Sequence, residues 1–350
     1  MQLLLRRKHL ANRLPEIIEL QRLAAALQDF GRIETLTTVK VRDHALPIIA
    51  ISLGPKDVTT PVLAFFGGVH GLERVGTHLV NSFLGTIANL IKWDETLHSA
   101  LRSIRMVFVP LVNPTGMYLN HRANANGIDL MRNAPVEADD QHPVRLYSGH
   151  RISPKIPWYR GQEGAPMEAE TAAVSKFVQE RIFPAEAAIS LDVHSGFGLR
   201  DRLWFPYAKS KKPIYHIPEI YKVYELLNQS FPHHIYEVEP QSIQYTTHGD
   251  LWDYLYDKHR VEYPDRIFLP LTMEMGSWNW VKKNPRQLLY ALGAFNPMIP
   301  HRHSRTMRRH LILFDFLQKI TVAHGQWSKL TESDRQRLSM AAVDLWFHQV

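Results

Sequence analysis

The stretch from Phe65 to Glu73, which reads FFGGVHGLE, constrains the fold more than any other part of the chain. It continues a short apolar run that starts at Val62, and such a run is typical of a buried strand. The two glycines allow the backbone to turn sharply where this strand ends. His70 and Glu73 then follow three residues apart at the start of a predicted helix. An imidazole and a carboxylate can therefore face the same point, and both are ligands that Zn²⁺ accepts.

Composition limits the kinds of site that the chain can build. It has 350 residues, 45% of them apolar, which is enough for one large α/β domain or two smaller ones. It has no cysteine, so disulfides and thiolate metal sites are excluded, and any zinc must use His, Asp or Glu. The formal charge of +7 is compatible with an acidic ligand, a nucleic acid or solubility alone, and the charges are scattered.

Apolar runs alternate with stretches of helical periodicity along most of the chain. Strands are expected at residues 33–41, 46–53, 62–66, 104–112, 187–192 and 267–275, the first two as a hairpin. Helices are expected at residues 14–30, 74–91, 95–101, 166–183, 217–231, 249–259, 285–295, 306–320 and 332–347. Strands separated by helices indicate an α/β fold with a largely parallel or mixed sheet.

Polar side chains follow four of the predicted buried strands. They are His70 with Glu73, then Asn113, His194 and Glu274. Ligands of open α/β sheets gather outside the carboxyl ends of the strands, and an unpaired buried carboxylate is costly. Each residue alone is compatible with a hydrogen-bonded core histidine or a glutamate at a frayed strand end. Together with the long Arg- and Asn-rich loop after the second buried strand, they favour a functional site.

Several short stretches, in a fixed order between about residues 14 and 295, carry a resemblance to a known family. They are His70-Gly71-Leu72-Glu73, Asn113-Pro114-Thr115-Gly116, the run from Arg122 to Asn133, Leu191-Asp192-Val193-His194-Ser195-Gly196, Tyr245 with Gly249, and Thr272-Met273-Glu274. In these stretches the chain resembles the carboxypeptidase A-type zinc metallocarboxypeptidases, as a distant member of bacterial type. The spacing of 194 − 73 = 121 residues between Glu73 and His194 suits that family.

The resemblance implies a catalytic zinc site. His70, Glu73 and His194 would bind one Zn²⁺ ion and leave a fourth position for water. Glu274 would be the general base that takes the proton of that water and passes it to the leaving amine. Arg122 would stabilise the developing oxyanion.

The resemblance also implies a substrate-binding set around the metal. Arg132, with Asn133 as a possible second donor, would bind the terminal carboxylate of the substrate, and Tyr245 would close over it. Asp129 would orient His70 from behind. Ordinary alternatives exist, because Asp129 could be a turn cap and the arginines could be solvated loop residues.

Two positions depart from the family pattern. Met131 replaces the asparagine that usually precedes the carboxylate-binding arginine, and Leu72 replaces an arginine between the first two metal ligands. Both changes alter the expected contacts to the substrate, whereas the metal ligands and the base are retained. Trp252 and Ile243 are the candidates for the pocket that receives the substrate side chain.

For the fold, the resemblance implies a single α/β domain with a twisted, mixed, largely parallel sheet and helices on both faces. A zinc carboxypeptidase-like catalytic domain is expected over residues 1–300, with a helical extension packed on it over residues 301–350. Cis peptide bonds between non-proline residues are expected near the site, the candidates being Ser195–Gly196, Pro206–Tyr207 and Gly276–Ser277.

These features predict a zinc-dependent metallocarboxypeptidase that hydrolyses the C-terminal amide bond of a peptide, or of a small amide with a free carboxylate. The altered Met131 position keeps open a zinc-dependent deacylase or amidohydrolase of N-acyl amino acids. The basic charge keeps open a non-catalytic binding protein, although no nucleic-acid partner is expected. No membrane partner is expected either, and the short apolar run within Met1–Lys8 does not resemble a secretory signal, so we expect a cytoplasmic protein.

Overall fold

The computed structural model describes residues 10–139 and 146–347. Its eight-stranded sheet has the order β1-β2-β4-β3-β5-β8-β6-β7. The strands are β1 (Gly31–Val41), β2 (His44–Leu53), β3 (Val62–Gly67), β4 (Arg105–Val109), β5 (Ala187–Ser195), β6 (Arg202–Phe205), β7 (Glu237–Pro240) and β8 (Ile267–Met275). The central neighbours β4, β3, β5 and β8 run parallel, whereas β1, β2 and β6 introduce antiparallel pairs.

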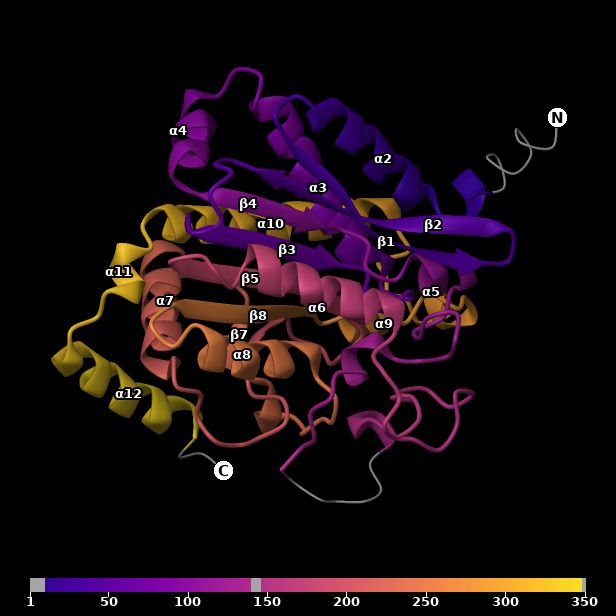
Figure 1. Cartoon of the computed structure of the whole chain (residues 1–350). Helices are drawn as coiled ribbons and strands as arrows, with labels where there is room; N and C mark the ends of the chain where they lie inside the picture. Colours follow the sequence, from indigo (N-terminus) through magenta and orange to yellow (C-terminus); the bar gives the residue numbers. More distant parts are fainter. Residues whose placement is uncertain (1–9, 140–145, 348–350) are drawn as a thin grey trace.

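Helices cover both faces of this sheet (Figure 1). They are α2 (Pro15–Leu27), α3 (Arg74–Leu90), α4 (Glu95–Ser103), α5 (Pro114–Leu119), α6 (Ala169–Arg181), α7 (Ile217–Ser230), α8 (Leu251–Glu262), α9 (Trp278–Lys283), α10 (Pro300–Val322), α11 (Gly325–Ser328) and α12 (Glu332–Trp346). Short 3₁₀ turns lie at η1 (Leu130–Arg132), η2 (Leu146–Ser148), η3 (Gln241–Ile243) and η4 (Pro285–Leu289). The predicted α/β class with helices on both faces is confirmed.

The alternation of side chains along the fully buried strand β3 creates two apolar cores. Leu63 and Phe65 pack in the core that contains α3 and α10, whereas Val62 and Phe66 pack in the core that contains α6 and α8. This alternation follows from the two-residue period of a strand. Because both faces are covered, the strand is apolar throughout, and only its carboxyl end is left for polar chemistry.

Most predicted elements are present, and the differences have local causes. Strands β6 and β7 were missed because each has only four residues and carries charged side chains. The helix expected at residues 285–295 is wrong, since the structure has η4 and irregular chain there. Of the three candidate cis bonds, Pro206–Tyr207 is cis, and the prediction is wrong for the other two.

Helix α10, which spans the start of the predicted C-terminal extension, belongs to the core on its face of the sheet. Phe314 of α10 stacks on Phe65 of β3 with 4.6 Å between ring centroids. The domain boundary at residue 300 stays a prediction. None of the helices within the described residues combines the length and apolar character that a membrane crossing requires.

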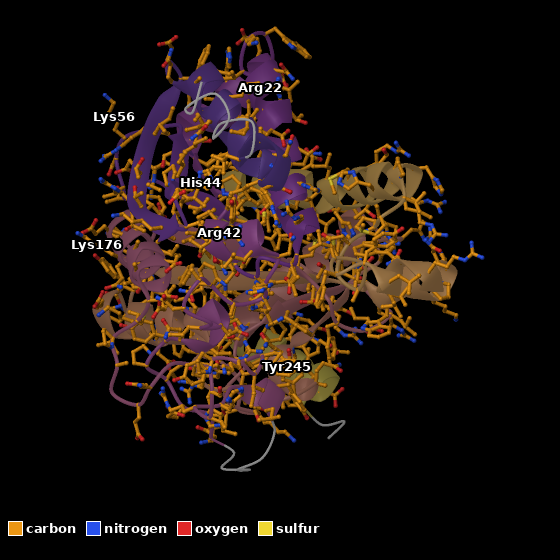
Figure 2. The ribbon with its side chains drawn as sticks, turned by 90° about the vertical axis from the view of Figure 1, so that its right-hand side faces the viewer. Arg22, Arg42, His44, Lys56, Lys176 and Tyr245 are labelled. Carbon is orange, nitrogen blue, oxygen red and sulfur yellow. The ribbon has the colours of Figure 1, made fainter. Side chains whose placement is uncertain are left out.

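The N-terminal run Met1–Lys8, for which no secretory signal is expected, lies outside the described residues. On the described surface, basic residues such as Arg22, Lys56 and Lys176 lie on separate parts of the molecule (Figure 2). The expected absence of a nucleic-acid partner and the cytoplasmic location stay predictions.

Candidate metal centre and active site

The register of the central strands brings the chemistry-bearing residues to one edge of the sheet. Gly67, the last residue of β3, pairs with Val193 of β5, so the loop that carries His70 starts beside His194. On the other side of β5, His194 itself pairs with Glu274 of β8. The carboxyl ends of three adjacent parallel strands therefore supply the site, as expected for an open α/β sheet.

Asn113 fixes the loop that carries His70 and Glu73. Its Nδ2 donates to the carbonyl of Val69 at 3.1 Å, and its Oδ1 accepts from the amide of Gly116 at 2.8 Å. The second contact is the side-chain cap at the start of helix α5. The side chain of Asn113 therefore shapes the turn that follows β4.

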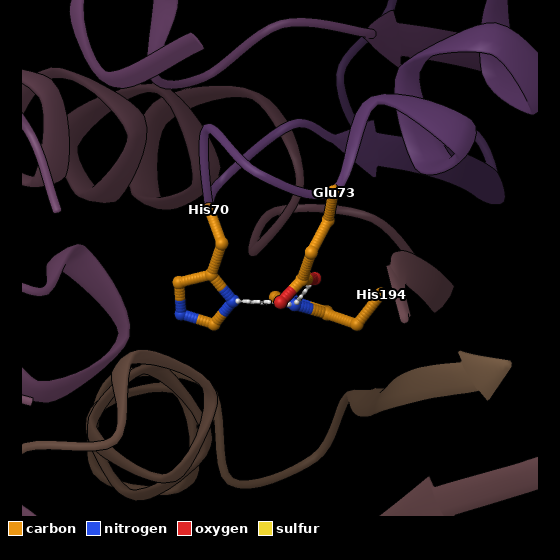
Figure 3. Close-up of side chains that lie close together, drawn as sticks. All are labelled: His70, Glu73 and His194. Atoms are coloured by element: carbon orange, nitrogen blue, oxygen red, sulfur yellow. Dashed lines mark hydrogen bonds and ion pairs between the residues drawn. The ribbon is translucent and has the colours of Figure 1, made fainter. Parts of the chain in front are cut away.

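The side chains of His70, Glu73 and His194 converge on one point (Figure 3). Nδ1 of His70 lies 2.9 Å from Oε1 of Glu73, and Nδ1 of His194 lies 3.0 Å from Oε2. The two Nδ1 atoms lie 3.2 Å apart. All three residues are buried, and a ligand atom from each lies within 4.8 Å of the others. This is the spatial convergence that the sequence predicted.

Each imidazole faces a second carboxylate on its other side. Nε2 of His70 lies 3.1 Å from Oδ1 of Asp129, and Nε2 of His194 lies 2.8 Å from Oδ2 of Asp192. In the neutral form of each ring, these carboxylates favour the proton on Nε2, which leaves the two Nδ1 lone pairs facing each other and the Glu73 carboxylate. Close acceptors without protons repel one another unless a cation lies between them. The donor set of two imidazoles and one carboxylate therefore fits a Zn²⁺ ion.

The titration of the ligands is consistent with this electrostatic arrangement. Burial opposes ionisation of Glu73, but His70 and His194 outweigh it and hold the pKa of Glu73 below its usual value. Burial lowers the pKa of His194, but Asp192 and Glu73 outweigh it and raise the pKa well above its usual value. Protons and a divalent cation therefore compete for the same negative site.

Glu274 lies at the end of β8, next to the three ligands in the same cavity. Its Oε1 accepts a hydrogen bond from the backbone amide of Phe197 at 2.9 Å, which fixes its direction. Burial, together with the negative charge of Glu73, raises the pKa of Glu274 to about 8 when no cation is bound nearby. Such a carboxyl group, poised to exchange a proton near neutral pH, is typical of a general acid–base residue.

Arg122 lies beside the ligands and is joined to them through Asp129. Its Nε donates to Oδ2 of Asp129 at 2.8 Å, and its Nη1 lies 3.4 Å from Oε1 of Glu73. Asp129 thus contacts both His70 and Arg122. Burial opposes ionisation of this carboxyl, but the charge of Arg122 and the hydrogen bond with His70 outweigh it and hold the pKa of Asp129 well below its usual value. Asp129 also caps the turn η1 through the amide of Met131, so the two roles considered for it occur together.

Arg132 ends the turn η1 and lines the cavity with only 4% of its surface exposed. Its Nε has no hydrogen-bond partner among the described residues, and its Nη1 donates to the carbonyl of Met131 at 3.3 Å. The backbone of Gly249 lies directly behind it, since a Cβ added there would lie 1.9 Å from the Arg132 carbonyl oxygen. A buried guanidinium with a free donor is suited to a carboxylate ligand.

Asn133 does not line the cavity, contrary to the expectation that it assists Arg132. Its Nδ2 donates to the carbonyl of Arg160 at 3.0 Å, and its Oδ1 accepts from the amide of Glu168 at 2.6 Å. Both ends of the amide are therefore used to hold surrounding loops. The structure leaves no contact through which Asn133 could replace the donor lost at Met131.

The cavity has a volume of about 530 Å³ and contains His70, Glu73, Arg122, Arg132, His194, Tyr245 and Glu274. Tyr245 packs against Tyr147 and Phe197 with ring centroids 5.5 and 5.6 Å apart. Figure 2 shows it far from the β1–β2 hairpin, where Arg42 and His44 are labelled. Met131 and Leu72 also line the cavity, whereas the two pocket candidates Trp252 and Ile243 do not.

The sequence reasoning missed two contributors to this site. Asp192 lies behind His194 and also accepts the indole N–H of Trp252 at 2.8 Å. The sequence carries a signal for Asp192, because residues two apart on a strand, such as Asp192 and His194, face the same side. The amide of Phe197, which holds Glu274, had no signal, since any residue type except proline carries a backbone N–H.

Comparison with known proteins agrees with this arrangement. The chain is 30% identical over 120 residues to carboxypeptidase SOL1 of Arabidopsis thaliana, a match that covers 32% of this chain and 24% of that protein. Matches to the curated relatives span between 23% and 28% of their lengths.

Two solved structures share the fold at low sequence identity. One is carboxypeptidase A from Helicoverpa armigera, with a TM-score of 0.62, 16% identity, and coverage of 89% of this chain and 72% of that one. The other is a Pseudomonas aeruginosa metallo-carboxypeptidase in complex with (2-guanidinoethylmercapto)succinic acid, with a TM-score of 0.53, 15% identity, and coverage of 88% and 68%. The family model described as zinc carboxypeptidase matches residues 8–283, which is most of the chain. The protein therefore belongs to the zinc carboxypeptidase family.

Proposed function

We propose that the protein is a zinc-dependent metallocarboxypeptidase that hydrolyses the C-terminal amide bond of a peptide. One observation carries the proposal: the ligand cluster of His70, Glu73 and His194 opens into the same cavity as Glu274 and Arg132. The cavity thus combines a site for a cation, a proton acceptor and a free guanidinium donor. These are the groups that hydrolysis next to a terminal carboxylate requires.

The ion would be held by Nδ1 of His70, Nδ1 of His194 and the carboxylate of Glu73. A zinc ion held in this way polarises the scissile carbonyl and makes a water molecule more acidic. Asp129 accepts from Nε2 of His70, and Asp192 lies 2.8 Å from Nε2 of His194, so each imidazole has a carboxylate behind it. One ion satisfies this donor set.

Glu274 moves the proton in the proposed reaction. Its pKa near 8 falls when a cation occupies the neighbouring ligands, because positive charge favours the carboxylate. The ionised carboxylate takes a proton from the attacking water as the C–O bond forms. It then gives that proton to the leaving nitrogen as the C–N bond breaks, which restores the carboxylate for the next cycle.

Two arginines and one tyrosine bind the substrate in this proposal. Arg122 donates to the carbonyl oxygen as it becomes negative, and Asp129 holds it in place. Arg132 binds the terminal carboxylate through its guanidinium group, whose Nε has no partner among the described residues. Tyr245 lies at the cavity wall, where it covers the bound residue and excludes water.

The Glu274→Gln substitution tests the proposal, because glutamine keeps the shape and loses the proton acceptor. We expect kcat on a chromogenic peptide with a free C-terminus to fall about 10²- to 10⁴-fold. Zinc content, measured by metal analysis, should remain one ion per chain. Full activity in this variant, or no zinc in the purified wild type, would contradict the assignment.

One observation favours a second candidate, a zinc-dependent deacylase of N-acyl amino acids. Met131 lines the cavity next to Arg132, and Asn133 faces away, so the terminal carboxylate has fewer donors than the family pattern provides. Such a deacylase would keep the same metal ligands and general base. Comparing kcat/KM for dipeptides and for N-acyl amino acids with the same terminal residue separates the two functions.

A further inference from the structure

A segment beyond the residues matched by the family model contacts the chain beside two members of the ligand cluster, Glu73 and His194. It comprises residues 292–296, between η4 and α10, and it is called here the 292–296 segment. Two of its residues, Phe295 and Asn296, contact the chain next to His194 and on both sides of Glu73. Neither residue belongs to the ligand set, so their contacts with the residues beside it need an explanation of their own.

Asn296 bridges the residues that flank Glu73. Its Nδ2 donates to the carbonyl of Leu72 at 2.7 Å, and its Oδ1 accepts from the amide of Val75 at 2.9 Å. The same Nδ2 also donates to the carbonyl of Leu292 at 2.9 Å, which ties the bridge to its own segment. A side-chain amide offers two donors and an acceptor in one plane, so aspartate and leucine cannot reproduce this set.

The side chain of Asn296 caps helix α3 in place of Glu73, whose own side chain points away from the helix. Glu73 is the N-cap residue of α3, yet its side chain makes no cap hydrogen bond because it points to the imidazoles. The first amides of a helix need acceptors from outside the helix. Asn296, which lies 221 residues after Val75, supplies the acceptor that a local cap residue normally provides.

Phe295 contacts the two residues that follow His194. Its carbonyl accepts from Oγ of Ser195 at 2.7 Å, and Ser195 directly follows the ligand His194. Its ring packs on Gly196, where a Cβ would lie only 2.9 Å away. Neighbouring residues of one segment therefore contact the chain beside Glu73 and beside His194.

We propose that Asn296, together with its neighbour Phe295, positions Glu73 and His194 so that they bind zinc. Asn296 is a positioning residue, since it reaches the ion only through the backbone around Glu73. The inference rests on the proposed zinc site, and it extends the site to a part of the chain outside the residues that the family model matches. The proposal also predicts that zinc affinity depends on the hydrogen bonds of Asn296, which is not itself a metal ligand.

The test is the zinc affinity of Asn296→Ala, measured by competition with a chromogenic chelator on the full-length protein. We expect the affinity to fall about 10- to 100-fold, as is usual when a group that orients a ligand is removed. The matched control is Asn228→Ala. Asn228 also makes two contacts, donating to the carbonyl of Tyr224 at 3.0 Å and lying 2.9 Å from Nε2 of His234, but it is remote in the fold, on α7.

Ser195→Ala provides a second variant that removes the contact to Phe295 and leaves helix α3 capped. We expect Ser195→Ala to lower zinc affinity, as Asn296→Ala does. The zinc affinity of Asn228→Ala should stay within about twofold of the wild type at a comparable loss of Tm. Wild-type affinity in both Asn296→Ala and Ser195→Ala would overturn the proposal. A wild-type protein that binds no zinc would instead refute the metal site itself, so the two failures are distinguishable.

Discussion

The close approach of Gly249 to Arg132 allows a prediction that separates backbone strain from displacement of a binding residue. Gly249 has a φ of +70°, and a Cβ on it would lie 1.9 Å from the carbonyl oxygen of Arg132. Its own backbone is held on both sides, because its amide donates to the carbonyl of Val136 at 2.8 Å and its carbonyl accepts from the amide of Ala134 at 3.0 Å. In Gly249→Ala, the added methyl group meets the Arg132 carbonyl directly, and we expect the Arg132 backbone to shift.

The magnitude follows from two separate contributions. A non-glycine residue at positive φ costs about 1–3 kcal/mol wherever it lies. An ordinary carbon–oxygen contact is about 3.4 Å, so the overlap requires a shift of about 1.5 Å, and such overpacking adds about 1–3 kcal/mol. A misplacement of about 1 Å in a binding group can reduce the rate about 100-fold. We expect a loss of that order in kcat/KM, mainly through KM, because Arg132 is assigned to substrate binding.

Gly164→Ala is the matched control, since Gly164 has a φ of +72° and a Cβ added there would have no atom within 4 Å. Urea unfolding and steady-state kinetics on a peptide with a free C-terminus should be measured for both variants. Gly164→Ala should lose only the strain contribution and keep wild-type kinetics. If both variants lose equal stability and both keep kcat/KM, the reasoning about Arg132 is refuted.

Two further predictions concern buried carboxylates. Asp192→Asn removes the charge behind His194, so we expect zinc affinity to fall about 10- to 100-fold in a chelator competition, and an unchanged affinity would contradict its orienting role. Glu16 is buried, which raises its pKa, but the hydrogen bond of His78 and the charge of Arg74 outweigh burial and lower the pKa below 4.5. Its stabilising contribution is therefore present above about pH 4.5 and lost as the pH falls through the folded-state pKa, so the stability gap between wild type and Glu16→Gln in urea unfolding should shrink between about pH 6 and pH 3. A gap that grows on acidification would contradict this sign.

The sequence was most informative where chemistry coincides with strand ends. The ligands could be found because apolar runs predict buried strands, and parallel strands place their carboxyl ends at one edge. His194 was assigned from the end of one run, and Glu274 from the end of another, and the register pairs them. Strand β8 was predicted with its observed bounds, Ile267 to Met275, because nine largely buried residues leave a clear pattern.

Other parts of the site depended on geometry that the sequence does not carry. Asn133 was assigned next to Arg132, but it is the C-cap residue after the 3₁₀ turn η1, and of the two only Arg132 lines the cavity. The contacts of Asn296 cross more than two hundred residues and have no local pattern. Pocket residues were the least predictable, because loops from several segments line the cavity and Trp252 instead lies behind Asp192.

The pairing of His194 with Glu274 on neighbouring strands has a consequence for how such a protein can diversify. Both residues are anchored in the hydrogen-bonded ladder between β5 and β8, whereas Tyr147, Trp158 and Tyr245 come from connecting segments. The position of Glu274 relative to His194 is thus set by rigid framework. Insertions and exchanges in the surrounding connections can reshape the cavity wall while the proposed catalytic pair keeps its dimensions.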